Sequence, residues 1–147
     1  MQIDEPALVL DLNDHARRAF ETAYGALSSA VPGLKLLLTT YFGAIGDNLD
    51  MALRLPVTSL HLDLVSAPAQ LEDVLAKAPT DLVLSLDVVD GRNIWRADLN
   101  AVLDRIEPVS KRTPGEIVGH HNLVGAGIGT VHGAYSHHGR QAAQAPQ

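Results

Sequence analysis

Apolar runs alternate with helical patterns along the first 112 residues of the chain. The runs cover residues 3–10, 34–42, 57–65 and 82–89. Between them, apolar residues recur at spacings of three and four, as on the buried face of a helix. Strands that alternate with helices predict parallel βαβ units, and strands that are apolar almost throughout predict a sheet covered on both faces. The pattern therefore predicts the α/β class.

Polar caps and prolines mark where the helices are expected to begin and end. The expected starts are Asn13 or Asp14, Asp47 or Asn48, and Ala67-Pro68. We expect Pro32-Gly33 to end the first helix. A last helix, which carries Trp95, is expected to end near Pro108.

These four strand–helix units fill about 110 residues, whereas a complete eightfold barrel needs roughly 250. The pattern is therefore compatible with two architectures: a small open α/β sheet, or four consecutive units of a (β/α)8 barrel. A half barrel leaves two open edge strands and an unclosed core. For such a chain we expect marginal stability or self-association.

Residues 113–147 differ in composition from the rest of the chain. They hold 7 of the 12 glycines and 5 of the 7 histidines, and only Glu116 and Arg140 are charged. We place a domain boundary near residue 112 and expect an irregular, disordered tail. The histidine spacing matches no helix or hairpin metal site, so adventitious surface binding is the favoured interpretation.

Charge and composition narrow the range of partners. The formal net charge of −6 argues against nucleic acid or an anionic membrane, since both require a basic face. No apolar run approaches the ~20 residues of a membrane span, and the first residues lack the pattern of a signal peptide. The sequence has no cysteine, which excludes disulfides and thiolate zinc sites within it. We expect a cytoplasmic protein.

Polar residues at the carboxyl ends of the expected strands are the candidate binding site, because α/β proteins place their chemistry there. The candidates are Asp4, Glu5, Asp63, Asp90, Arg92 and Asn93. Each also has a structural interpretation. The carboxylates at 4 and 5 can cap a neighbouring loop, and this is the favoured interpretation. Asp63 is expected to accept hydrogen bonds from Thr39, Thr40 or Arg92. The polar residues at 90–93 can equally anchor a loop, with the arginine paired to an aspartate.

Four segments together resemble the cobalamin-independent methionine synthase family, specifically its N-terminal barrel domain. They read QIDEPALV at 2–9, KLLLTTYFG at 35–43, LHLDLV at 60–65 and VVDGRNIWRADL at 88–99. Their shared order and spacing make the resemblance more specific than any single motif. It covers about residues 1–112 and implies the second half of that barrel.

The resemblance also carries expectations about function. The family transfers a methyl group from 5-methyltetrahydropteroyl-polyglutamate to homocysteine in methionine biosynthesis, and zinc activates the thiol. Its zinc ligands and homocysteine contacts belong to a C-terminal barrel, so the resemblance implies no catalytic residue and no bound zinc in this chain. We expect a fragment that is inactive alone. The alternative is a non-catalytic α/β module that binds a small ligand or oligomerises.

The chain departs from the family pattern in three places. Asp87 stands where the family usually has glycine, and Ser66 where it usually has arginine. After Arg112 the usual continuation gives way to the glycine- and histidine-rich tail. A truncated or frame-shifted gene product is the simplest hypothesis for this change.

Overall fold

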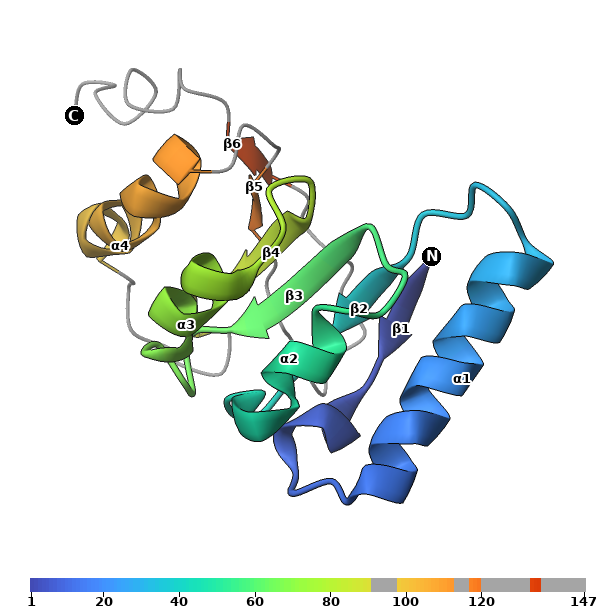
Figure 1. Cartoon of the computed structure of the whole chain (residues 1–147). Helices are drawn as coiled ribbons and strands as arrows, with labels where there is room; N and C mark the ends of the chain where they lie inside the picture. Colours follow the sequence, from blue (N-terminus) through green and yellow to red (C-terminus); the bar gives the residue numbers. More distant parts are fainter. Residues whose placement is uncertain (91–97, 113–116, 120–132, 136–147) are drawn as a thin grey trace.

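A computed structural model describes residues 1–90, 98–112, 117–119 and 133–135 of the chain (Figure 1). Its strands are β1 (Gln2–Asp4), β2 (Leu37–Thr39), β3 (Ser59–Asp63), β4 (Val83–Asp87), β5 (Ile117–Gly119) and β6 (Gly133–Tyr135). Its α-helices are α1 (Asp14–Ala30), α2 (Leu49–Ala52), α3 (Gln70–Lys77) and α4 (Leu99–Arg112), and its 3-10 helices are η1 (Pro6–Val9) and η2 (Gly46–Asn48). The alternation of strands and helices confirms the predicted α/β class.

The strands form one sheet in the same order as in the chain. From β1 to β5 each strand pairs with the next in parallel, and β6 pairs antiparallel with β5. Because the strand order never reverses, successive crossovers of one hand keep their helices on one side of the sheet. Figure 1 shows α1, α2 and α3 on the same face. This arrangement differs from a doubly wound sheet, in which the strand order reverses.

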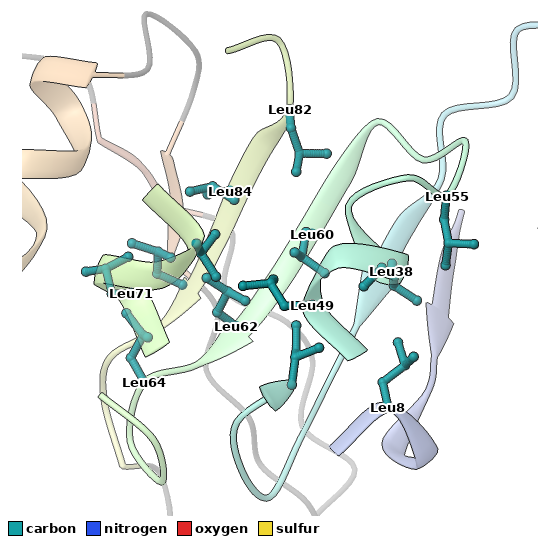
Figure 2. Close-up of a cluster of buried hydrophobic side chains, with 14 of the residues drawn as sticks. Leu8, Leu38, Leu49, Leu55, Leu60, Leu62, Leu64, Leu71, Leu82 and Leu84 are labelled. Carbon is teal, nitrogen blue, oxygen red and sulfur yellow. The ribbon is translucent and has the colours of Figure 1, made fainter. Parts of the chain in front are cut away.

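The register separates apolar from polar side chains. Leu38, Leu60 and Leu84 lie in register on neighbouring strands, as do Leu62 and Leu86. Since paired residues point to the same face, and successive residues of a strand to opposite faces, these leucines all lie on one side. All five are buried. Figure 2 shows Leu38, Leu60, Leu62 and Leu84 with Leu49 of α2 and Leu71 of α3. The core is therefore the leucine layer between the sheet and its helices.

The first helix begins and ends at its sequence signals. Asn13 Oδ1 accepts a hydrogen bond from the Ala16 N–H at 2.9 Å, so this residue is the N-cap. The helix ends at Ala30, and Gly33 follows with a φ of +83°. Glycine adopts this left-handed conformation without the steric cost that a side chain imposes.

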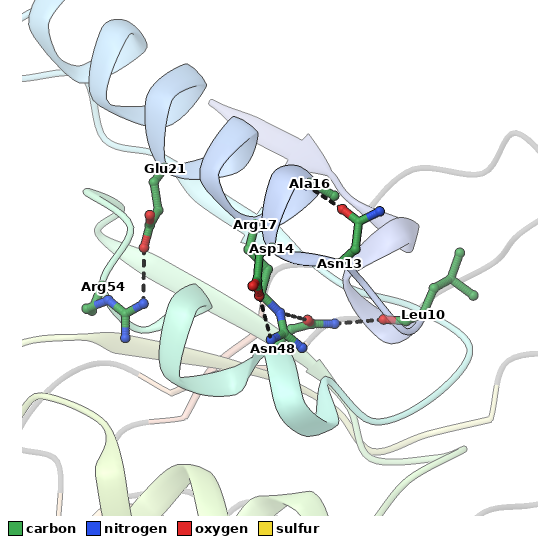
Figure 3. Close-up of polar contacts among 8 residues, drawn as sticks. All are labelled: Leu10, Asn13, Asp14, Ala16, Arg17, Glu21, Asn48 and Arg54. Atoms are coloured by element: carbon green, nitrogen blue, oxygen red, sulfur yellow. Dashed lines mark hydrogen bonds and ion pairs between the residues drawn. The ribbon is translucent and has the colours of Figure 1, made fainter.

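Asn48 joins α1 to the loop after β1. Its Nδ2 donates to the carbonyl oxygens of Leu8 and Leu10, at 2.9 and 2.8 Å. Its Oδ1 accepts from Arg17 Nε at 3.0 Å (Figure 3). A buried amide that both donates and accepts fixes this loop without leaving a costly unpaired group.

Several predicted boundaries differ from the structure. The helix expected to start at Ala67-Pro68 begins at Gln70, after a turn at residues 68–69. Residues 6–9 form a 3-10 turn instead of continuing the first strand, because Pro6 has no N–H to give to a strand ladder. The last helix continues past Pro108 to Arg112. Ile106 and Val109 are buried on either side of this proline, and their burial offsets the hydrogen bond that proline removes.

Two short segments of the tail, which is expected to be mostly irregular, form strands. β5 pairs with the outer edge of β4, and β6 pairs with β5. Backbone N–H and C=O groups on an open strand edge can pair with almost any extended segment, whatever its side chains. The rest of residues 113–147 lies outside the described part of the chain. Among the described helices, none is long and apolar enough to cross a membrane.

Candidate functional site

The carboxyl ends of the parallel strands carry a row of polar side chains. Thr39, His61 and Ser85 lie in register on neighbouring strands, and Asp4 continues the row on β1. Two residues further along these strands, Asp63 lies in register with Asp87. By alternation these side chains point to the face opposite the leucine layer. Apart from the exposed Asp4, all of them are buried. We call these six residues the polar row.

The buried side chain of His61 contacts neighbouring side chains on both sides of its strand. Its Nδ1 lies 2.9 Å from Ser85 Oγ, and its ring centroid lies 6.0 Å from that of Tyr41. Thr40 Oγ1 donates to the His61 carbonyl oxygen at 2.9 Å. The sequence analysis did not select His61 or Ser85. The signal that could have found them is the period of two, with polar residues at 61, 63, 85 and 87 inside apolar runs.

Asp63 is held by backbone amides. Its carboxylate accepts hydrogen bonds from the N–H groups of Phe42, Val65 and Ser66, at 2.9, 3.1 and 2.7 Å. The expectation that Thr39 or Thr40 donates to it is wrong. The Thr40 hydroxyl donates to the His61 carbonyl oxygen, and the Thr39 hydroxyl has no hydrogen-bond partner among the described residues. The backbone amides of the loops that follow β2 and β3 donate to it instead.

Gln70 completes the attachment of the loop that follows β2. Its Oε1 accepts from the Ile45 N–H at 3.2 Å, and its Nε2 donates to the Asp63 carbonyl oxygen at 2.8 Å. Together Asp63 and Gln70 fix residues 42–45 against the end of β3. The sequence analysis missed Gln70, which lies in the first turn of α3 and resembles an ordinary surface residue in sequence.

Phe42 lies in this fixed loop in an uncommon conformation. Its φ is +70°, and its side chain is 59% exposed. A left-handed backbone costs a residue with a Cβ roughly 1–2 kcal/mol, and burial of the ring does not compensate here. The hydrogen bond from its N–H to Asp63 favours the strained geometry. Strain held in this way is common at functional sites.

The candidates Asp4 and Glu5 both contact neighbouring side chains. Asp4 Oδ1 accepts from Tyr41 Oη at 2.9 Å and from Gln2 Nε2 at 2.8 Å. Glu5 Oε1 accepts from Tyr24 Oη at 3.1 Å. The structure therefore brings Asp4 to the polar row, while Glu5 points to α1. Their role in ligand binding stays a prediction.

The remaining candidates lie after β4. Asp90 is half-buried at the end of the described segment. Arg92 and Asn93 lie outside the described residues, and so does the predicted pairing of the arginine with an aspartate. The structure thus brings Asp4 and Asp63 to the carboxyl ends of the strands. A binding or anchoring role for residues 90–93 stays a prediction.

Metal binding can be tested on the described residues. Among them, no group of three or more His, Asp or Glu side chains is arranged to hold a metal ion. The sequence contains no cysteine, the ligand that zinc sites use most readily beside histidine. The described residues therefore do not fit a zinc ion.

Fold and site together define a class of protein. The chain is a parallel α/β protein with its helices on one face and a buried polar row on the other, at the strand ends where such proteins bind their ligands. A family model described as "Cobalamin-independent synthase, N-terminal domain" matches residues 1–114. The chain belongs to this family.

Individual relatives agree with the family assignment. A 5-methyltetrahydropteroyltriglutamate–homocysteine methyltransferase from Rhodopseudomonas palustris is 61% identical over 118 residues, which cover 80% of this chain and 15% of the relative. Proteins with the same name from Nitrobacter winogradskyi and Vibrio cholerae are 66% and 50% identical over 109 residues each, or 74% of this chain and 14% of each relative. The chain therefore spans only about 15% of the length of these curated relatives.

The three amide contacts of Asp63 predict a loss of stability in Asp63→Asn. The amide group offers one acceptor oxygen and turns an NH2 toward backbone donors, so we expect a loss of about 1–3 kcal/mol. Urea unfolding followed by circular dichroism measures it, with the exposed Asp81→Asn as the matched control. Equal unfolding midpoints for the two variants would contradict the anchoring role of Asp63.

The positive φ of Phe42 predicts opposite effects of two small substitutions. Phe42→Ala keeps the Cβ and hence the strain, whereas Phe42→Gly removes both. We expect the glycine variant to be more stable than the alanine variant by about 1 kcal/mol. Thermal unfolding of the pair measures the difference. An alanine variant that is the more stable of the two would show that the loop is not strained.

Tyr24 predicts a dependence of stability on alkaline pH. Burial, together with the Glu5 carboxylate, raises the pKa of Tyr24 above its ordinary value of 10. A raised pKa contributes stability that is complete below pH 10 and is lost as the pH rises toward the folded-state pKa. We expect Tyr24→Phe to lose about 0.5–1.5 kcal/mol at neutral pH and to weaken less steeply above pH 10. Urea midpoints from pH 7 to 11 check this, and parallel curves would contradict it.

Proposed function

We propose that this chain is a supporting part of the N-terminal domain of a methyltransferase, one that transfers a methyl group from 5-methyltetrahydropteroyl-polyglutamate to homocysteine to give methionine. The observation that carries the proposal is the 61% identity to such a methyltransferase over most of the chain. The homologous region makes up 15% of the relative, and we propose this activity for the whole protein, not for this chain's own residues.

The proposed architecture is four consecutive units of a (β/α)8 barrel. Sequential parallel strands with their helices on one face support it, because a barrel is built by continuing this arrangement until the sheet closes. The polar row would then face the inside of the barrel at its carboxyl end. The division into a barrel segment at 1–112 and a separate tail at 113–147 belongs to the same proposal.

The proposed role is structural and not catalytic. The side chains of Asp63 and Gln70 form hydrogen bonds with the chain's own backbone, as anchoring groups do. We propose that zinc, homocysteine and the folate donor are bound by other parts of the full-length protein, in the cytoplasm, and that this chain alone does not turn over substrate.

A chimera tests the proposal. The matched segment of the Rhodopseudomonas palustris methyltransferase is replaced by residues 1–112 of this chain, and methionine formation from homocysteine and 5-methyltetrahydropteroyltriglutamate is measured. We expect activity within about tenfold of the parent, which corresponds to about 1.4 kcal/mol, and background activity for the isolated chain.

A chimera with Leu62→Arg is the matched control, because a charge in the leucine layer should abolish both folding and activity. A folded chimera without activity would contradict the supporting role. Turnover by the isolated chain would contradict the proposed division of labour.

A further inference from the structure

Half of the backbone groups of β4 point away from β3. The Val83 N–H donates to the Thr58 carbonyl oxygen at 3.1 Å, on the side of β3. In a parallel ladder the backbone groups of alternate residues point to the same neighbour, so Ser85 also faces β3. The N–H and C=O groups of Leu84 and Leu86 therefore point to the outer side of β4.

The sequence of β4 makes it a strand whose outer side is unsafe to leave open. The strand reads VLSLD, and two valines follow it. An unpaired edge on an apolar strand is a template for pairing with a strand of another molecule, which leads to aggregation. A chain that stays monomeric therefore needs a segment of its own on this edge.

The tail supplies such a segment. Val118 of β5 lies in register with Ser85, between the outward groups of Leu84 and Leu86, and β6 pairs with the other side of β5 (Figure 1). The border of the sheet thereby moves from the five residues of β4 to the three residues of β6. Very short edge strands are one of the means by which natural proteins prevent edge pairing.

Both tail strands lie outside the segment that the family model matches, which ends at residue 114. We propose that β5 and β6 form an intramolecular cap that blocks the pairing of β4 with the β4 strand of a second copy of this chain. A second copy is the competitor because identical apolar segments pair well with one another. The inference goes beyond the proposed function, since the cap consists of residues outside the matched segment.

Amide hydrogen exchange of the full chain of 147 residues tests the cap without any substitution. The Ser85 N–H points to β3 and the Leu86 N–H to β5, and paired amides exchange slowly. We expect the two amides to exchange within about tenfold of each other, at a concentration at which size exclusion shows a monomer. A Leu86 amide that exchanges like an unpaired one, or that is protected only where the chain dimerises, would overturn the proposal.

A pair of substitutions at Val118 tests whether β5 is the segment that protects Leu86. Val118→Pro removes an N–H from a strand that lies between two others, whereas Val118→Thr keeps this N–H and the branched Cβ. At low concentration we expect Leu86 to exchange at least about tenfold faster in the proline variant, with Ser85 unchanged and the threonine variant like the wild type. Equal protection of Leu86 in the two variants, with helix content retained by circular dichroism, would contradict the cap.

The concentration dependence of the proline variant tests what the cap excludes. We expect this variant to dimerise as its concentration rises and the Leu86 amide to become protected again, because a second β4 then pairs with it. A folded proline variant that stays monomeric, or whose dimer leaves Leu86 unprotected, would show that β4 is not the surface that the cap shields. If the proline variant loses its helix content, the exchange of the wild type decides alone.

Discussion

The parallel pairing of β1 to β4 in chain order is the constraint on which the rest of the structure depends. Because each strand lies in register with the next, every second residue of all four strands faces the same side. Leucines occupy one side, where the helices cover them, and polar groups occupy the other. A slip of one residue in any strand would bring its polar side chains into the leucine layer. The same register brings Thr39, His61 and Ser85 together as neighbours.

Local hydrogen bonds offset the cost of burying the Asp63 carboxylate on the second face. The Asp63 carboxylate is matched by three backbone N–H groups, and Gln70 ties the same loop by both ends of its amide. This network holds Phe42 in a strained and exposed position. The strand ends are thus organised by the chain's own hydrogen bonds, as the supporting residues of a rigid site are.

Family membership and size together shape the functional interpretation. The chain is a clear relative of long methyltransferases and yet corresponds to a small share of each. We therefore propose that the polar row serves packing and positioning.

The sequence by itself determined the α/β class, the limits of α1 and the family resemblance, because these depend on local periodicity, capping and the identity of short segments. It placed Asp63 at a strand end but named the wrong threonine donors. Only the tertiary structure decided that loop amides bind this carboxylate, that His61 meets Ser85, and that Val109 keeps α4 helical beyond Pro108. These features depend on which residues the sheet register and the packing bring together across distant parts of the chain, and single-sequence patterns carry no information about such pairs.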